Sequence, residues 1–156
     1  MKRLIFFALL STVLSAAYFG PGLVSSSGTA HAFEIVGLGN KCLDVFGGNP
    51  VDAMPIILFQ CHGAPNQQWR PGPNNQIRGL AEKCLDVSGG NVVDGAPIIL
   101  FQCHGGLNQQ WSLQPNGAIR GLGNKCLDVF GGNVADGAQL ILFQCHGGIN
   151  QQFRFQ

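Results

Sequence analysis

A thirteen-residue segment that occurs three times at a fixed spacing constrains this chain more than any other feature. The copies are ILFQCHGAPNQQW at 57–69, ILFQCHGGLNQQW at 99–111 and ILFQCHGGINQQF at 141–153. Each copy begins about 42 residues after the previous one, and most residues between the copies also match. A repeat of this length forms one structural unit that packs against its neighbours, so the fold must accommodate three equivalent units.

Each repeat has the pattern of short β-strands separated by turns. In the second repeat, CLDV at 84–87 and PIILF at 97–101 are strand-like runs, and Gly-Gly and Asp-Gly turn signals lie between them. Two more short strands are expected within 108–113 and 117–122. No window shows ten residues of helical periodicity without Gly or Pro. We therefore predict an all-β chain with about four strands per repeat, or about twelve in total.

The two ends of the chain complement each other. The third repeat stops at Gln156, before any match to the segment at 115–120, while EIVGLGNKC at 34–42 aligns with AIRGLGNKC at 118–126. The first strand is therefore expected to complete the third repeat, which leaves no free strand edge. The predicted repeats are about 37–78, 79–120, and 121–156 together with 33–36. Threefold repetition, four strands per unit and closed ends predict a β-trefoil.

Residues 1–32 have the pattern of a secretory signal peptide. A basic start is followed by an apolar run over 4–19 and by Ala-His-Ala at 30–32. An uncleaved membrane anchor is the alternative, but the run is shorter than the roughly 18 residues of a typical span. We expect a secreted domain over 33–156 without a membrane span. Residues 33–156 contain seven basic and eight acidic residues with no visible basic patch, so nucleic acid is not an expected partner.

All six cysteines lie after residue 32, which predicts disulfide bonds in a secreted chain. Equivalent repeats should form equivalent bridges, and this favours the pairs Cys42–Cys61, Cys84–Cys103 and Cys126–Cys145. The alternative set joins neighbouring repeats through Cys61–Cys84 and Cys103–Cys126, and it pairs Cys42 with Cys145. Metal binding by the three Cys-His pairs is a further alternative, but disulfides would consume the thiols.

The motifs CLDV, LFQCHG and Gln-x-Trp resemble those of the ricin B-type lectin family, and in particular its bacterial family 13 carbohydrate-binding modules. The resemblance extends over 33–156, with all three motifs in register in each repeat. It implies that Trp69, Trp111 and Phe153 are buried packing residues. It also implies a non-catalytic lectin without a cofactor. Galactose- or xylose-type sugars are the expected ligands, bound by up to three weak sites that gain strength through avidity.

The resemblance implies one sugar site in each repeat. Each site combines an Asp that accepts sugar hydroxyls, a Phe platform, a His beside the sugar, an Asn that contacts the sugar and a Gln that braces the Asp. The residues are Asp44, Phe59, His62, Asn66 and Gln67; Asp86, Phe101, His104, Asn108 and Gln109; and Asp128, Phe143, His146, Asn150 and Gln151. Alternation along CLDV places the Leu inward, so we expect the carboxylate to face solvent and to accept two hydroxyl donors.

Each of these assignments has a structural alternative. The Asp also fits a solubilising role, the Phe fits core packing, and the His fits an ordinary surface position. One departure from the family pattern affects all three sites, because Ile57, Ile99 and Ile141 stand where many members have Gln. This replacement predicts weak affinity, a preference for a more apolar sugar, or sites that no longer bind.

Other functional classes fit the sequence less well. Asp44 and Asp52 resemble the carboxylate pair of a glycosidase, but a threefold copy of a catalytic pair is unexpected, and nothing in the sequence tunes one carboxyl against the other. We therefore expect no enzymatic activity. The main alternative is a protein-binding trefoil, such as a toxin receptor-binding subunit or an inhibitor. A separate enzyme or toxin subunit is accordingly a candidate partner.

Overall fold

The computed structural model describes residues 31–156, so the predicted signal peptide lies almost wholly outside the described residues. Within that range the chain forms twelve strands and no α-helix. The strands are β1 (Ile35–Val36), β2 (Cys42–Val45), β3 (Met54–Phe59), β4 (Arg70–Pro71), β5 (Ile77–Arg78), β6 (Cys84–Val87), β7 (Ala96–Phe101), β8 (Ser112–Leu113), β9 (Ile119–Arg120), β10 (Cys126–Val129), β11 (Ala138–Phe143) and β12 (Arg154–Phe155). The all-β prediction with twelve strands is confirmed.

Single turns of 3₁₀ helix connect the strands, and all of them except η4 recur at equivalent places in the three repeats. They are η1 (Leu38–Asn40), η2 (Phe46–Gly48), η3 (Pro65–Gln67), η4 (Pro73–Asn75), η5 (Leu80–Glu82), η6 (Ser88–Gly90), η7 (Leu107–Gln109), η8 (Leu122–Asn124), η9 (Phe130–Gly132) and η10 (Ile149–Gln151). Between residues 31 and 156, no helix has the length and apolar character needed to cross a membrane.

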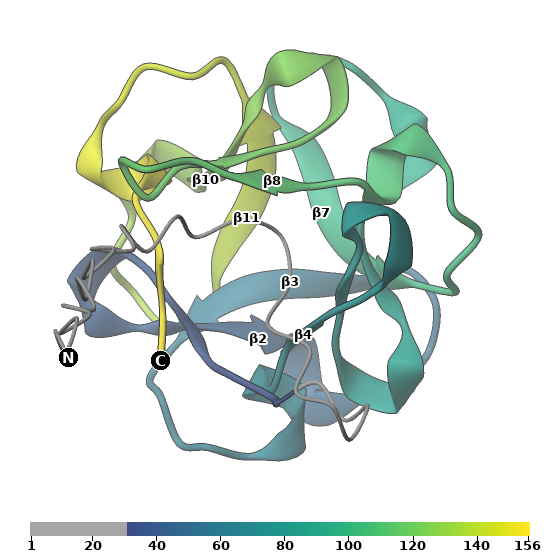
Figure 1. The fold of residues 1–156 in the computed structure, drawn as a ribbon. Coiled ribbons are helices and arrows are strands. Elements are labelled where there is room, and N and C mark those ends of the chain that lie inside the picture. The colour runs from purple at the N-terminus through teal and green to yellow at the C-terminus, as the bar shows by residue number, and fades with distance from the viewer. Residues whose placement is uncertain (1–30) are drawn as a thin grey trace, which may run out of the picture.

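The three longest strands, β3, β7 and β11, pair with one another in antiparallel fashion and close a triangle at the centre of the fold (Figure 1). Each of them also pairs with the CLDV strand that precedes it, β2, β6 or β10. The register is the same in every repeat and places the Asp of CLDV opposite an Ile. The pairs are Asp44 with Ile57, Asp86 with Ile99 and Asp128 with Ile141. The threefold sequence repeat is therefore a threefold structural repeat.

The first strand completes the third repeat, as predicted. β1 pairs with β12, with Ile35 opposite Phe155, in the same way that β5 pairs with β4 and β9 pairs with β8. Backbone hydrogen bonds of 2.7 and 3.1 Å between Glu34 and Gln156 extend this pairing. The outer hairpin of the third unit is thus formed by the two ends of the described chain.

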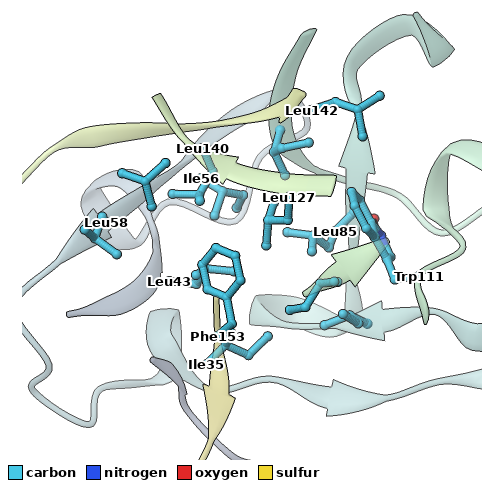
Figure 2. Close-up of a cluster of buried hydrophobic side chains, with 14 of the residues drawn as sticks. Ile35, Leu43, Ile56, Leu58, Leu85, Trp111, Leu127, Leu140, Leu142 and Phe153 are labelled. Carbon is cyan, nitrogen blue, oxygen red and sulfur yellow. The ribbon is translucent and has the colours of Figure 1, made fainter. Parts of the chain in front are cut away.

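The core contains the same apolar positions from each repeat, and Figure 2 shows their side chains converging. Fully buried positions shared by the repeats include Leu43, Leu85 and Leu127; Ile56, Ile98 and Leu140; and Leu58, Leu100 and Leu142. Each such side chain contributes about 1.5–3 kcal/mol of burial free energy. The aromatic residues of the Gln-x-Trp motif are buried beside them, as expected, with exposed fractions of 0–5%.

A glycine at the start of the following repeat makes room for the aromatic ring of the Gln-x-Trp motif. A Cβ atom on Gly79 would lie 2.6 Å from the ring of Trp69, and one on Gly121 would lie 2.6 Å from the ring of Trp111. The indole Nε1 of Trp69 then reaches the carbonyl oxygen of Leu43 at 3.1 Å. The ring therefore ties the CLDV strand of one repeat to the first residues of the next.

The predicted disulfide pairing within repeats is confirmed. Cys42–Cys61, Cys84–Cys103 and Cys126–Cys145 each join residues 19 positions apart. Each bridge connects the start of a CLDV strand to the loop that follows the next long strand. On the chain-entropy account, closing a loop of this size stabilises the fold by about 3 kcal/mol.

The second aspartate of each repeat links its repeat to the following one. Asp94 accepts a hydrogen bond from Lys125 Nζ at 2.6 Å and another from the backbone N–H of Gln144 at 2.8 Å. The same arrangement joins Asp52 to Lys83 and Gln102, and Asp136 to Lys41 and Gln60. The neighbouring lysine holds the pKa of each of these carboxyls below its usual value.

Candidate functional site

Three equivalent polar clusters lie on the opposite side of the CLDV strands from the core leucines. In the first repeat, Asp44 projects from β2 beside Ile57, and the loop after β3 brings His62, Asn66 and Gln67 to it. Asn66 Nδ2 donates to Asp44 Oδ1 at 2.9 Å, and Gln67 Nε2 donates to Asp44 Oδ2 at 2.8 Å. The second and third repeats form the same bonds at 2.7–3.0 Å. The structure therefore brings together the polar residues that the sequence pattern predicted.

Gln67 is the buried centre of the first cluster, with an exposed fraction of 0%. Its amide nitrogen donates to Asp44 and also to the carbonyl oxygen of Gln60 at 3.0 Å. Its amide oxygen accepts the backbone N–H of His62 at 2.8 Å. Gln67 thus holds the carboxylate and the loop in fixed positions relative to each other. Gln109 and Gln151 make the same contacts.

Both ring nitrogens of His62 are already occupied by groups of the protein. The backbone N–H of Ala64 donates to Nδ1 at 3.3 Å, so in the neutral ring the proton is on Nε2, which lies 3.2 Å from Asp44 Oδ2. Equivalent contacts are made by His104 and His146. The histidines therefore support the carboxylates, and their ring nitrogens are not free to bind a ligand.

The carboxylates are buried, and the prediction that they face solvent is wrong. Asp44, Asp86 and Asp128 have exposed fractions of 3%, 2% and 3%. Alternation does place them opposite the core, but amide and imidazole groups of the following loop cover them. Burial raises the pKa of Asp86, while hydrogen bonds from Gln109 and Asn108 oppose this rise.

Most of the hydrogen-bonding capacity of each carboxylate is used within the protein. A carboxylate has about four lone-pair positions. In the first repeat, Gln67 and His62 contact Oδ2 of Asp44, and Asn66 contacts Oδ1. One position on Oδ1 remains for an external donor, such as a hydroxyl group, instead of the two that we predicted.

The phenylalanine of each repeat lies at the surface beside the polar cluster and outside the core. Phe59 and Phe143 are each 36% exposed, and Phe101 is partly buried. The ring of Phe59 meets the ring of His62 edge-on, with centroids 6.0 Å apart, and the other repeats show the same contact. The histidine braces the edge of the phenyl ring, so the ring keeps a defined orientation.

A hollow of about 440 Å³ lies over the cluster of the second repeat. Four of its lining residues were predicted as site residues: Asp86, Phe101, His104 and Asn108. Ile99, which the sequence singled out as a departure from the family pattern, also lines it. Sequence reasoning missed Ser88, Gly89, Gly90 and Ala53. The hollow therefore combines one carboxylate and one amide with an apolar surface of Ile and Phe.

Comparison of the sequence with known protein families identifies the family of this chain. The ricin-type beta-trefoil lectin domain matches residues 31–153. The chain belongs to this family. Among solved structures, a designed threefold-symmetric protein, ThreeFoil, is 32% identical with a TM-score of 0.75, and the match covers 80% of this chain and 96% of that one. No sequence among the curated proteins matches significantly.

Two of the similar solved structures of natural proteins contain bound sugars. The C-terminal half of an earthworm R-type lectin, in complex with GalNAc, is 25% identical with a TM-score of 0.71, over 81% of this chain and 98% of that one. A non-toxic homologue of type II ribosome-inactivating proteins from bitter gourd, in complex with α-methyl-D-galactoside, is 25% identical with a TM-score of 0.71. That match covers 80% of this chain and 46% of the bitter gourd chain.

In this ricin-type domain the cysteines offer no thiolate to a metal. The cysteine of each Cys-His motif forms a disulfide bond with the cysteine of CLDV in the same repeat. Among residues 31–156, the one set of side chains with metal-like spacing is Glu34, Cys42 and Cys61, and two of its members form a disulfide. The Cys-His motif therefore has a structural use, in which the disulfide anchors the loop that carries the histidine.

Proposed function

We propose that this protein binds carbohydrate non-catalytically through up to three equivalent sites, in the manner of the family 13 carbohydrate-binding modules. The observation that carries the proposal is the hollow of the second repeat, in which the carboxylate of Asp86, braced by Gln109 and Asn108, lies beside Phe101. The first and third repeats contain the same braced carboxylate beside Phe59 and Phe143.

The hollow has the chemistry that a sugar ring requires. Asn108 contacts both oxygens of Asp86, and Gln109 and His104 contact Oδ2, so one acceptor position is left on Oδ1 for a hydroxyl group, next to the amide of Asn108. Phe101 presents an apolar ring to the C–H face of the sugar, and Ile99 extends that apolar surface. A galactose-type sugar is the first candidate, because the earthworm and bitter gourd relatives were solved with GalNAc and a galactoside.

The arrangement supports binding without catalysis. Glycoside hydrolysis uses two carboxyl groups across the scissile bond. The second aspartate of the first repeat, Asp52, instead forms an ion pair with Lys83 and accepts a backbone N–H from Gln102. The three disulfides are consistent with secretion into an oxidising environment, which agrees with the leader-like pattern of residues 1–32.

Calorimetric titration with GalNAc, α-methyl-D-galactoside and xylose tests the proposal. The parent should bind at least one of these sugars with a stoichiometry above one. Replacing Phe59, Phe101 and Phe143 together by Ala should abolish the binding, while the control Leu113→Ala, an exposed apolar residue on β8, should leave it unchanged. A folded parent that binds none of these sugars would contradict the proposal.

A further inference from the structure

The repeats differ at two of the positions that line the hollow of the second repeat: the position that follows CLDV, and that of Ala53, whose counterparts are Gly95 and Gly137. The residue that follows CLDV is Phe46 in the first repeat, Ser88 in the second and Phe130 in the third. Ser88 lines the hollow of the second repeat. A change at this position therefore alters the wall of the site without altering its carboxylate, its platform or its histidine.

The backbone at this position is the same in all three repeats. The preceding Val45, Val87 and Val129 have ψ angles of 114°, 113° and 112°. The glycines that follow, Gly47, Gly89 and Gly131, have φ angles of 66°, 64° and 62°. The side chains of Phe46 and Phe130 consequently leave the backbone in the place from which Ser88 borders its hollow.

The turn that carries Phe46 contacts the polar cluster of its own repeat. A Cβ atom on Gly48, in the same turn η2, would lie 3.8 Å from Cγ of Asn66. Asn66 in turn donates to Asp44. Phe46 thus lies on a segment that is continuous with the candidate site of the first repeat.

The two phenyl rings are exposed to solvent. Phe46 is 54% exposed and Phe130 is 59% exposed, and neither packs against the buried core. In the described part of the chain, neither ring forms an aromatic pair, whereas Phe59 pairs with His62. The ring of Phe46 therefore does not fold onto the Phe59 platform, and it remains available to a ligand.

Exposed rings at equivalent positions in two repeats require a reason. Single exposed apolar residues are common on protein surfaces, but these two lie at the same position beside equivalent candidate sites, where a bound ligand would cover them. If Phe46 and Phe130 closed their sites, the rings would be buried against the platform phenylalanines. The exposure of more than half of each residue favours an added contact over a blocked site.

We propose that Phe46 and Phe130 form a second aromatic subsite, which contacts the neighbouring ring of an oligosaccharide. The sites of the first and third repeats then recognise two linked sugar rings, one on the platform phenylalanine and one on the added phenylalanine. The site of the second repeat, where Ser88 replaces the aromatic ring, recognises one ring. This inference rests on the proposed carbohydrate-binding function and specifies the ligand class, a disaccharide unit within a longer glycan.

Paired monosaccharide and disaccharide probes test the inference by calorimetric titration. The probes are galactose with lactose, and xylose with xylobiose. One variant, Phe46→Ser with Phe130→Ser, makes the outer sites resemble the second. The reverse variant, Ser88→Phe, makes the second site resemble the outer ones. Circular dichroism of both variants serves as the folding control, and the exposure of these positions predicts little change in stability.

In the parent, the disaccharide should bind more tightly than its monosaccharide by roughly fivefold at two of the three sites, the factor that about 1 kcal/mol of ring packing produces. The double Phe→Ser variant should lose this preference and keep its affinity for the monosaccharide. Ser88→Phe should add a third site with the preference. A double variant that retains the preference, or that weakens both probes equally, would overturn the subsite and leave the proposed function intact. A parent that binds none of the four probes would overturn both.

Discussion

Lys41 donates a hydrogen bond through Nζ to Asp136 Oδ1 at 2.6 Å, although the two residues are 95 positions apart in the chain. The pair is the third of three equivalent links, and it joins the last repeat to the first. The same carboxylate oxygen accepts the backbone N–H of Gln60 at 2.9 Å. The polar links between repeats therefore form a closed ring, as the strands do.

The link between Asp136 and Lys41 predicts a dependence of stability on acid. The lysine lowers the pKa of Asp136 in the folded protein. The ion pair therefore stabilises the fold at pH values above the pKa of Asp136 in the unfolded chain, near 3.8, and this stabilisation is lost as the pH falls through the pKa in the folded protein. Asp136→Asn should therefore be less stable than the parent at pH 6, and the two proteins should converge as the pH falls below the lowered pKa of Asp136. Urea unfolding midpoints between pH 2.5 and 6 measure this difference. A difference that stays constant over the whole range would exclude the ionic link.

The fold was predictable from the sequence because its evidence is local and repeated three times. CLDV, PIILF and Gln-x-Trp each place the same side chains in the core in every repeat, and the alignment of 34–42 with 118–126 reveals the closure. The same symmetry reduces the disulfide pairings to one set within repeats and one set between neighbouring repeats, and the structure shows the favoured set within repeats. Each of these inferences needs only the assumption that equivalent sequences adopt equivalent structures.

The burial of the aspartates was not predictable in the same way. Alternation correctly indicates which face of the strand Asp44 leaves, but it does not reveal what covers that face. The covering groups, Asn66 and Gln67, come from a loop more than twenty residues later. The links between Asp94 and Lys125 were missed for the same reason, because their contact depends on how neighbouring repeats pack.

The Gln-x-Trp position of the third repeat predicts a stabilising substitution. Trp69 and Trp111 donate hydrogen bonds from Nε1 to the carbonyl oxygens of Leu43 and Leu85, at 3.1 and 2.9 Å. Phe153 occupies the equivalent position and has no such donor. Phe153→Trp should add one buried hydrogen bond and raise the free energy of unfolding by about 0.5–1.5 kcal/mol. Denaturant unfolding measures the change, with Trp111→Phe as the matched control, which should lose a similar amount. A less stable Phe153→Trp variant would show that the indole does not fit in the third repeat.

Because the carboxylate of Asp86 is buried, replacing this residue of the candidate site should also destabilise the fold. Asp86→Ala leaves the amide of Gln109 without one of its buried acceptors, which should cost about 1–3 kcal/mol of folding free energy. Asp86→Asn keeps one acceptor oxygen and should cost less. Val93→Ala, at an exposed position, should stay within about 0.5 kcal/mol of the parent. If thermal unfolding finds Asp86→Ala as stable as the parent, then the carboxylate faces solvent in solution.

The affinity of the second site for sugar should decrease at acidic pH. Burial raises the pKa of Asp86, so protonation begins above the ordinary value of 3.8, and a protonated carboxyl accepts a sugar hydroxyl less well. The effect of pH on folding has the opposite sign. Because the pKa of Asp86 is raised in the folded protein, protonated Asp86 favours the folded state, and this contribution to stability decreases as the pH rises through the raised pKa. Titration of a variant with Phe59→Ala and Phe143→Ala, which retains the second site, should show binding at pH 7 that weakens toward pH 4. Binding that is equally strong at both pH values would remove Asp86 from the contact.

The three platform phenylalanines predict how the protein should bind an immobilised polysaccharide. Loss of one phenyl ring removes the platform of its own site, with about 0.5–1.5 kcal/mol of ring packing in addition to the apolar area that the sugar would bury, and it leaves the other two sites available. Single Phe→Ala variants at 59, 101 or 143 should therefore reduce retention only in part. The triple variant should lose retention altogether, because avidity requires simultaneous engagement of several sites.

These substitutions test the sites more cleanly than changes of Asp44 or its equivalents, since the rings lie outside the core whereas the carboxylates are buried. Circular dichroism checks the fold, and Leu113→Ala serves as the exposed apolar control. If one single variant abolished retention while the other two had no effect, then one site alone would bind the polysaccharide, and the repetition of the segment would serve the fold.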